Sequence, residues 1–448
     1  MTFWKPSLLR WTYLFFTMLG LAHAADIKLE LEEENEMYKY TWPSNGSGAF
    51  WTTGNSCIVR RGKEVYATGI EHMPKKANPN NVRWVLFKKT DGKMLRIADG
   101  GDTSEREPCP IGALKDGTVL ISSNPVDAKP RNSTAKLLFI NPKKDKAELS
   151  PLTVDWGGKF QANQHSYRSF SVDAENNTSL LFYQNPSIHQ TYWACYEGTK
   201  LIKNGKITYP RGMYGKRGVS MRICYAASQI KDWAAHYVGV SDIQEPVEKF
   251  RGMTSSWVFR RLYYIWSPDV RTGKFSKWVE IANYDEMDGY TKASDILIES
   301  KSKVWLLWYG RELSNSRKIK AAFPTKKKQR VTLYCSLLSN GKLVSTKAIY
   351  DWKEGQKGAQ PGRWARFHTT PAGKRYVLYY AGANYIVQVK NGKTVGKAVK
   401  LPIKNHVKMF FIPTVRNGST LSNTIEMIGQ KKWARSAHSI YYFRIKIK

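Results

Sequence analysis

Residues 165–185 read HSYRSFSVDAENNTSLLFYQN, two short apolar segments separated by a polar turn. Apolar and polar side chains alternate within each segment, which is typical of β-strands, and the turn between them makes the pair a hairpin. The same pattern recurs in residues 55–71, 107–125, 221–242, 292–311, 363–384 and 408–429. The chain therefore contains seven copies of one predicted β-hairpin.

A second hairpin follows nearly every copy. Most of these second hairpins carry a DG, NG or TG turn flanked by alternating apolar residues, which is a strong local signal for a hairpin. They occupy residues 83–97, 191–209, 261–281, 331–350 and 385–401, with a weaker version at 136–154. Two hairpins make four antiparallel strands, and repeats of this size predict the blades of a β-propeller. A β-sandwich with long loops is the alternative, but it does not account for seven paired hairpins.

The last copy is followed by only one further strand, in residues 439–448. Residues 26–42 alternate like a strand and precede the first copy. We expect this N-terminal strand to complete the last blade, because closing the ring removes exposed sheet edges. The predicted fold is all-β: a seven-bladed propeller of four-stranded antiparallel blades, closed by the N-terminal strand.

The first 24 residues predict export from the cytoplasm. Lys5 and Arg10 precede an apolar run in residues 11–22, and Ala22-His23-Ala24 resembles a signal-peptidase site. The predicted organisation is a signal peptide in residues 1–24 and a single propeller domain in residues 25–448, secreted or periplasmic after cleavage near Ala24. A retained anchor is the alternative, but the run is too short to span a bilayer, and no later segment is long enough.

The composition is strongly basic, with 71 Lys and Arg against 36 Asp and Glu and a formal charge of +35. Such a charge attracts anions to the surface. Since an exported protein meets little nucleic acid, we expect an acidic polysaccharide or oligosaccharide as partner; a solvated basic surface without a specific ligand is the alternative. The number of cysteines, 5, is odd, so at least one is unpaired, and a bridge between Cys57 and Cys109 stays open.

In a propeller, the loops that enter each innermost strand and those that join the second strand to the third open on one face, here called the near face. Binding residues concentrate on such loops. The predicted catalytic residues on this face are His165, His189, Tyr167 and Tyr225. The predicted substrate-binding residues are Arg168, Arg222, Arg366, His368, Arg311, Arg83 and His72. For Arg168 and Arg366, an ion pair between blades is the alternative.

This set suits elimination at a uronic acid. Arginine can neutralise the sugar carboxylate with its paired donors, so that a histidine or tyrosine can abstract the C5 proton while another protonates the leaving glycosidic oxygen. A glycoside hydrolase would need paired carboxylates, for which the candidates are Asp285, Glu286, Asp288 and Asp295. A propeller that binds polyanions without catalysis is the third hypothesis. No cofactor motif or metal-ligand spacing is present in the sequence, although a structural Ca²⁺ at residues 285–288 stays open.

HSYRSFSVDAENNTSLLFY and RWARFHTTPAGKRYVLYYAG, which begin at His165 and Arg363, resemble the repeats of BNR-type, sialidase-like propellers. Within that group the sequence is most similar to the seven-bladed families that include ulvan lyases and related rhamnose–glucuronate-cleaving enzymes. The resemblance implies acid–base roles for His165 and His189, with Tyr225 and Arg222 next. The sialidase Asp-box, S-x-D-x-G-x-T-W, is not intact, and residues 267–278 approximate it only with an insertion. This departure favours the lyase over a sialidase or rhamnosidase type of hydrolase.

Overall fold

Seven four-stranded antiparallel sheets follow one another along the chain in the computed structural model. The structure describes residues 27–127, 132–141, 148–158, 160, 162–163, 165, 167–185, 190–210, 222–245, 247–250, 252–253, 257–313, 321–325, 328–431 and 438–448. The predicted signal peptide and His189 lie outside these residues.

The first four sheets, blades 1 to 4, run outward from the axis in chain order. Blade 1 contains β2 (Ile58–Arg61), β3 (Glu64–His72), β4 (Val82–Thr90) and β5 (Lys93–Asp99). Blade 2 contains β6 (Ile111–Ala113), β7 (Val119–Ser123), β9 (Lys136–Asn141) and β10 (Glu148–Thr153). Blade 3 contains β12 (Ser169–Asp173), β13 (Thr178–Asn185), β14 (Gln190–Glu197) and β15 (Lys200–Thr208). Blade 4 contains β16 (Arg222–Lys231), β17 (Ala234–Gln244), β19 (Arg261–Ser267) and β20 (Val279–Asn283).

The remaining sheets, blades 5 to 7, complete the circuit. Blade 5 contains β21 (Tyr290–Ser300), β22 (Lys303–Arg311), β23 (Arg330–Ser339) and β24 (Lys342–Lys353). Blade 6 contains β25 (Arg366–Thr369), β26 (Arg375–Tyr380), β27 (Asn384–Lys390) and β28 (Lys393–Lys400). Blade 7 contains β29 (Met409–Phe411), β30 (Thr424–Gln430), β31 (His438–Ile447) and β1 (Leu29–Tyr40). Short additions are β8 (Asn132–Ser133) with β11 (Ala162–Asn163), β18 (Trp257–Val258) on β17, and the 3₁₀ turns η2 (Glu248–Phe250), η3 (Val270–Thr272) and η4 (Asp285–Met287).

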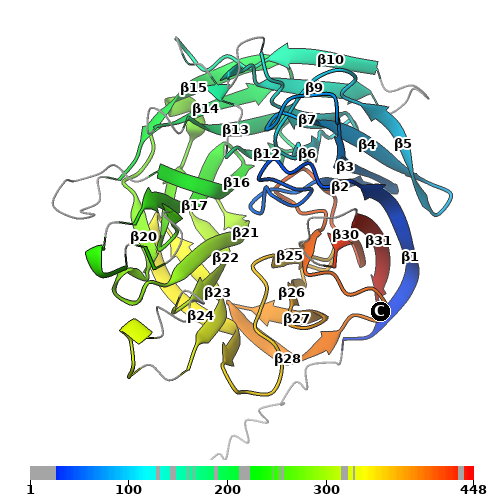
Figure 1. Cartoon of the computed structure of the whole chain (residues 1–448). Helices are drawn as coiled ribbons and strands as arrows, with labels where there is room; N and C mark the ends of the chain where they lie inside the picture. The colour runs from blue at the N-terminus through cyan, green and yellow to red at the C-terminus, as the bar shows by residue number, and fades with distance from the viewer. Residues whose placement is uncertain are drawn as a thin grey trace, which may run out of the picture.

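The N-terminal strand closes the ring, as the sequence predicts. β1 pairs antiparallel with β31, from Leu29 opposite Ile447 to Tyr40 opposite His438. Figure 1 shows the blue β1 alongside the red β31, with the other blades following the colour bar around the axis. The two ends of the described chain thus share one blade, and β31 is not left as an unpaired edge.

Burial changes from the axis outward, because inner strands are covered by neighbouring blades on both faces. Every residue of β7 and of β12 is buried. The outermost strands β24 and β28 are largely exposed and carry several lysines. The cores form between adjacent blades: Leu180, Phe182 and Trp193 of blade 3 pack in one cluster with Tyr237 and Ile265 of blade 4.

The loop between β29 and β30, residues 412–423, crosses the axis and binds several inner strands. The backbone of Asn417 accepts a hydrogen bond from the Ala113 N–H at 3.0 Å, and the carbonyl of Arg416 accepts one from Val172 at 2.8 Å. Gly418 has a φ of +83°, and a Cβ there would overlap the carbonyl oxygen of Ala113. The loop therefore plugs the centre of the ring, and we call it the axial plug.

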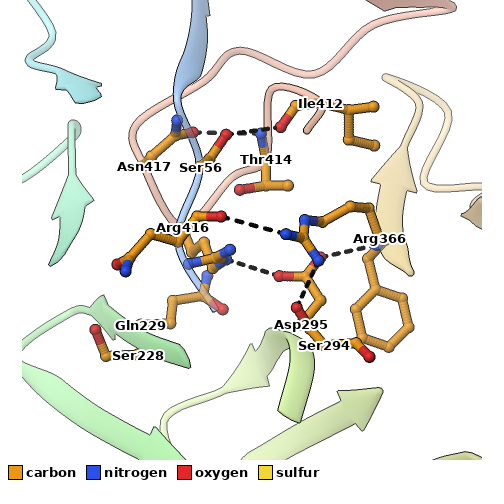
Figure 2. Close-up of polar contacts among 12 residues, drawn as sticks. Ser56, Ser228, Gln229, Ser294, Asp295, Arg366, Ile412, Thr414, Arg416 and Asn417 are labelled. Atoms are coloured by element: carbon orange, nitrogen blue, oxygen red, sulfur yellow. Dashed lines mark hydrogen bonds and ion pairs between the residues drawn. The ribbon is translucent and has the colours of Figure 1, made fainter. Parts of the chain in front are cut away.

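An ion pair ties the axial plug to the opposite side of the ring. Arg416 Nε donates to Asp295 Oδ1 at 2.7 Å, and both side chains are fully buried. The other oxygen of Asp295 accepts the backbone N–H of Phe367 at 2.8 Å. Figure 2 shows Asp295 beside Arg416 and Arg366 at the axis. Asp295 therefore links the plug to blades 5 and 6 through a side-chain ion pair and a backbone hydrogen bond.

The buried histidines His236 and His368 make the fold sensitive to acid. Burial lowers the pKa of each to about 4. His236 contacts the Tyr264 hydroxyl at 2.6 Å and His368 contacts the carbonyl of Ser422 at 2.8 Å. Burial outweighs the carbonyl contacts, which favour the charged ring, and keeps both histidines neutral.

We expect the free energy of unfolding to fall as the pH drops from the unfolded-state pKa of about 6.5 to about 4. In that window the unfolded chain binds protons that the native rings do not, so acid favours unfolding by roughly 3 kcal/mol per histidine. Urea unfolding at a series of pH values measures the slope. His368→Gln, which keeps a donor for the Ser422 carbonyl, should reduce it; an unchanged slope would contradict this assignment.

Candidate functional site

A cavity of about 490 Å³ opens on the near face. The segments around it enter inner strands or join second strands to third ones, which is where the propeller pattern places a site. It is lined by Phe50, Trp51, Thr53, His165, Tyr167, Arg222, Tyr225, Asp242, Trp257, Phe259, Tyr290, Lys292, Arg363 and Trp364. His165, Tyr167, Arg222 and Tyr225, four of the residues predicted from the sequence, therefore lie together.

Two of the four, Tyr167 and Tyr225, have strained backbones. Their φ angles are +43° and +49°, in the left-handed region that bulky residues rarely adopt. Tyr225 lies in a bulge where the pairing of β16 with β17 shifts between Cys224 and Ala227. Such conformations cost on the order of 1–3 kcal/mol each and cluster at functional sites. Here they bring the two rings to 4.8 Å between centroids.

His165 is held by a buried carboxylate. Its Nδ1 lies 2.6 Å from Glu107 Oε1, and the Glu107 side chain is 2 % exposed. Burial would raise the pKa of Glu107, but the hydrogen bond from His165 and the positive charge of Arg168 act against it, and the pKa of Glu107 is lowered. Since a carboxylate only accepts, Nδ1 carries the proton and Nε2 is the basic nitrogen. A histidine fixed in this way can act as a general base.

The two tyrosines can provide protons. Burial raises the pKa of both Tyr167 and Tyr225 above the ordinary value of 10.0, so both hydroxyls stay protonated at neutral pH. Tyr167 lies 3.8 Å from His165 between ring centroids. A base and two neutral hydroxyl donors thus lie side by side on one wall of the cavity.

Arg222 stands at the rim with a carboxylate and an indole. Its Nη2 pairs with Asp242 Oδ2 at 3.0 Å, and its guanidinium lies 4.0 Å from the ring centroid of Trp257. Burial raises the pKa of Asp242 despite the opposing charge of Arg222. Trp257 belongs to β18, the extra strand of blade 4, and is 39 % exposed. The pair presents a flat, cationic surface of the kind that acidic sugars can contact.

Lys292 and Arg363 are basic side chains of the cavity that were not predicted as site residues from the sequence. Lys292 is 4 % exposed, and its Nζ lies 3.5 Å from the ring centroid of Tyr225. Arg363 Nη1 donates to the hydroxyl of Tyr290 at 2.7 Å, and its guanidinium packs over Trp364. A signal for Lys292 existed, because it opens the fifth hairpin copy much as Arg222 opens the fourth.

Arg168 and Arg366 do not line the cavity. Arg168 pairs with Glu105 at 3.3 Å and donates to the carbonyl of Pro108 at 2.8 Å. Arg366 donates to the carbonyls of Ser294 and Thr53 at 2.7 and 2.6 Å. Both side chains are buried. Arg168 makes an ion pair of the kind weighed as its alternative, whereas the hydrogen bonds of Arg366 go to backbone carbonyls.

The other predicted binding residues are spread over the molecule. His368 lies in β25 and contacts Ser422 of the axial plug, while His72 contacts Asn81 within blade 1. Arg83 pairs with Glu71 at 2.7 Å, also in blade 1. Arg311 packs over Tyr290, a lining residue, at 5.4 Å but does not itself line the cavity. His189 lies outside the described residues.

Three of the four carboxylates considered for a hydrolase are engaged elsewhere: Asp285 pairs with Arg261, Asp288 with Arg260, and Asp295 with Arg416 at the axis. The fourth, Glu286, is exposed in η4 and does not line the cavity. Among the described lining residues, Asp242 is the one carboxylate of the cavity. No group of three or more His, Cys, Asp or Glu side chains is placed to hold a metal ion in the part of the chain that the structure describes.

The five cysteines, all of which the structure describes, form no disulfide. All five are buried free thiols, including Cys57 and Cys109, and Cys57 Sγ lies 3.8 Å from the carbonyl of Cys109. Within the described residues, no helix has the length and apolar character needed to cross a membrane.

The chain shares its fold with known propellers. The structure of polysaccharide lyase Uly1 is similar with a TM-score of 0.53 and 11 % identity, over 93 % of this chain and 99 % of that one. The GH93 α-L-arabinofuranosidase of Fusarium graminearum gives a TM-score of 0.47 and 10 % identity, over 93 % and 98 %. An α-L-arabinanase of Penicillium chrysogenum gives 0.44 and 9 %, over 88 % and 98 %.

Sequence comparison adds no relative. No protein-family model matches the chain, and no curated protein matches it. The likeness to the lyase structure concerns the fold alone, which the sheet topology already shows, and the chemistry depends on the side chains of the cavity.

Proposed function

We propose that this protein is an exported polysaccharide lyase that acts on uronate-containing, acidic polysaccharide. The observation that carries the proposal is the single cavity in which a carboxylate-fixed histidine, two neutral tyrosines and several cations converge. The basic charge of +35 supports an anionic substrate, and the N-terminal pattern supports export. The fold shared with a polysaccharide lyase, and the resemblance of two hairpin repeats to those of BNR-type propellers, are compatible with this chemistry.

The proposed reaction is a β-elimination. Cations of the cavity, Arg222 among them, neutralise the uronate carboxylate and make the C5 proton removable. His165 Nε2 takes that proton, and the electron pair forms the C4–C5 double bond as the C4–O glycosidic bond breaks. The tyrosine pair Tyr167–Tyr225 gives a proton to the departing oxygen, so that charge does not accumulate on it. The products are one unsaturated uronate end and one new reducing end.

The aromatic wall of the cavity supports a sugar ligand. Trp51, Trp257, Tyr290 and Trp364 present ring faces or edges around the polar groups. Flat rings suit the apolar faces of sugar rings, while the cations fix the carboxylate. Because Asp242 is the only lining carboxylate among the described residues and is paired with Arg222, the cavity offers no free pair of acids for hydrolysis.

The test is to incubate the purified protein with ulvan, glucuronans, pectins and glycosaminoglycans while following two signals. One is the ultraviolet absorbance of the unsaturated uronate, and the other is the number of reducing ends. We expect both to rise together with one substrate of the panel. Reducing ends without absorbance would indicate a glycoside hydrolase of sialidase or rhamnosidase type, and salt-sensitive binding without turnover would indicate a polyanion-binding propeller.

A further inference from the structure

Lys292 differs from the other cations of the cavity in its surroundings. Among the described residues, Arg222 is ion-paired with Asp242 and Arg363 is hydrogen-bonded to Tyr290, whereas Lys292 has neither kind of partner. Its Nζ faces the ring of Tyr225 at 3.5 Å, and the side chain is almost completely buried at the cavity. A buried ammonium without a compensating charge is costly, so this position favours the neutral amine.

The charges around Lys292 act in both directions, and burial outweighs those that favour the ammonium. Burial is the main cause that lowers the pKa of Lys292 well below 10.5, and the positive charge of Arg363 adds to it, while Cys224 and Asp242 oppose it. The titratable and charged groups that line the cavity with Lys292 are His165, Tyr167, Arg222, Tyr225, Asp242, Tyr290 and Arg363. Cys224 of β16 also acts on its charge, and Tyr309 of β22 pairs with it across the sheet. Asp242, the one carboxylate among them, is already ion-paired with Arg222.

We propose that the ε-amino group of Lys292 binds the carboxylate of the acidic sugar and takes up a proton from solution as it does so. The inference rests on the proposed function in one respect, namely that the ligand is an acidic sugar. The balance is simple: the neutral amine, a solvent proton and the bound carboxylate give an ammonium–carboxylate pair. An opposite charge within a few ångströms favours the ammonium form of lysine, so the ligand carboxylate supplies the ion-pair partner that Lys292 lacks in the free protein.

This coupling makes affinity for the carboxylate depend on pH. Between the pKa of Lys292 in the free protein and its higher pKa in the complex, binding brings a proton with it. Within that window the apparent affinity should fall by about tenfold for each unit by which the pH rises. Arg222 and Arg363 contribute no such slope, because guanidinium groups stay protonated.

The experiment is isothermal titration calorimetry of sodium D-glucuronate into the intact protein, in two buffers of different ionisation enthalpy. At mildly alkaline pH we expect the observed enthalpy to depend on the buffer, with uptake of about one proton per ligand bound. Lys292→Arg is the matched variant: it keeps a cation in the cavity and should bind glucuronate without proton uptake. The methyl ester of glucuronate, which has no carboxylate, should bind without uptake to either protein.

A second measurement needs no ligand. The unfolding equilibria of the wild type and of Lys292→Met are compared across alkaline pH. In the window between the native pKa and 10.5 the unfolded wild type binds the proton that native Lys292 does not. Wild-type stability should therefore rise with pH relative to Lys292→Met, by up to about tenfold in the unfolding constant per pH unit.

Three results would overturn the proposal: glucuronate that does not bind, binding without proton uptake, or uptake that persists in Lys292→Arg. Each is distinct from failure of the lyase assignment. A protein that takes up a proton with glucuronate but forms no unsaturated product keeps the role of Lys292 and loses the elimination. A protein that cleaves its substrate without proton coupling keeps the elimination and loses this role of Lys292.

Discussion

Asp295→Ala should destabilise the propeller by about 3–5 kcal/mol, because it leaves the guanidinium of Arg416 buried without its countercharge. Asp295 joins the axial plug to blades 5 and 6 through Arg416 and through the backbone of Phe367. Both charged side chains are fully buried, so water cannot replace the lost carboxylate without opening the centre of the ring. Urea unfolding of the wild type and the variant at neutral pH measures the difference.

Two further variants separate the lost charge from the lost hydrogen bonds. Asp295→Asn keeps an acceptor oxygen for the N–H of Phe367 and should cost less than Asp295→Ala. The double variant Asp295→Leu with Arg416→Met replaces the pair by apolar groups and should recover much of the stability, since a buried ion pair is often no better than a packed apolar one. If Asp295→Ala unfolds at the wild-type urea concentration, the axial ion pair does not hold the plug.

The fold could be predicted because its signals are local. Each hairpin of the repeat is marked by a turn and by alternation over fewer than about ten residues on either side. The predicted closure also followed from counting strands, and β1 does pair with β31 in blade 7. A propeller is thus readable from the sequence, because its blades are built from neighbouring segments and few long-range pairings are needed.

The position of the cavity could be predicted for the same reason. Inner strands begin on the near face, so Tyr167, Arg222 and Tyr225, at the starts of two hairpin copies, had to meet there. The backbone strain of the tyrosines could not be foreseen, because no glycine or asparagine marks those turns. Lys292 was missed because a lysine at the start of a strand usually ends in solvent, and only the three-dimensional packing buries it.

The misplaced arginines show where pattern reasoning stops. Arg168 and Arg366 stand near the starts of inner strands, like the site residues, yet their side chains are buried and bind backbone carbonyls of other segments. The direction depends on partners far away in the chain: Arg366 binds Thr53, 313 residues away. Asp295 and Arg416 are likewise 121 residues apart. Contacts of this kind leave no periodic signal.

The second large effect concerns the proposed base. His165→Ala should lower kcat/KM on the cleaved polysaccharide by roughly 10²–10⁴-fold, the usual contribution of a positioned acid–base group. The fold should persist, because the His165 ring lines the cavity. Its removal leaves Glu107 beside Arg168, whose positive charge also stabilises that carboxylate. Formation of the unsaturated product, followed together with the unfolding midpoint, measures both effects.

Arg222→Ala and His406→Ala complete the comparison. Arg222→Ala should also abolish turnover without unfolding the protein, since it removes a cation from the cavity and exposes Trp257. His406 does not line the cavity; its Nδ1 accepts the backbone N–H of Asn384, and His406→Ala should leave turnover unchanged. If His165→Ala and Arg222→Ala both cleave at the wild-type rate, the near-face cavity is not the place where the bond breaks. A loss in His165→Ala with an intact fold would instead tie the chemistry to the histidine that Glu107 holds, because Glu107 leaves only Nε2 free to accept the proton.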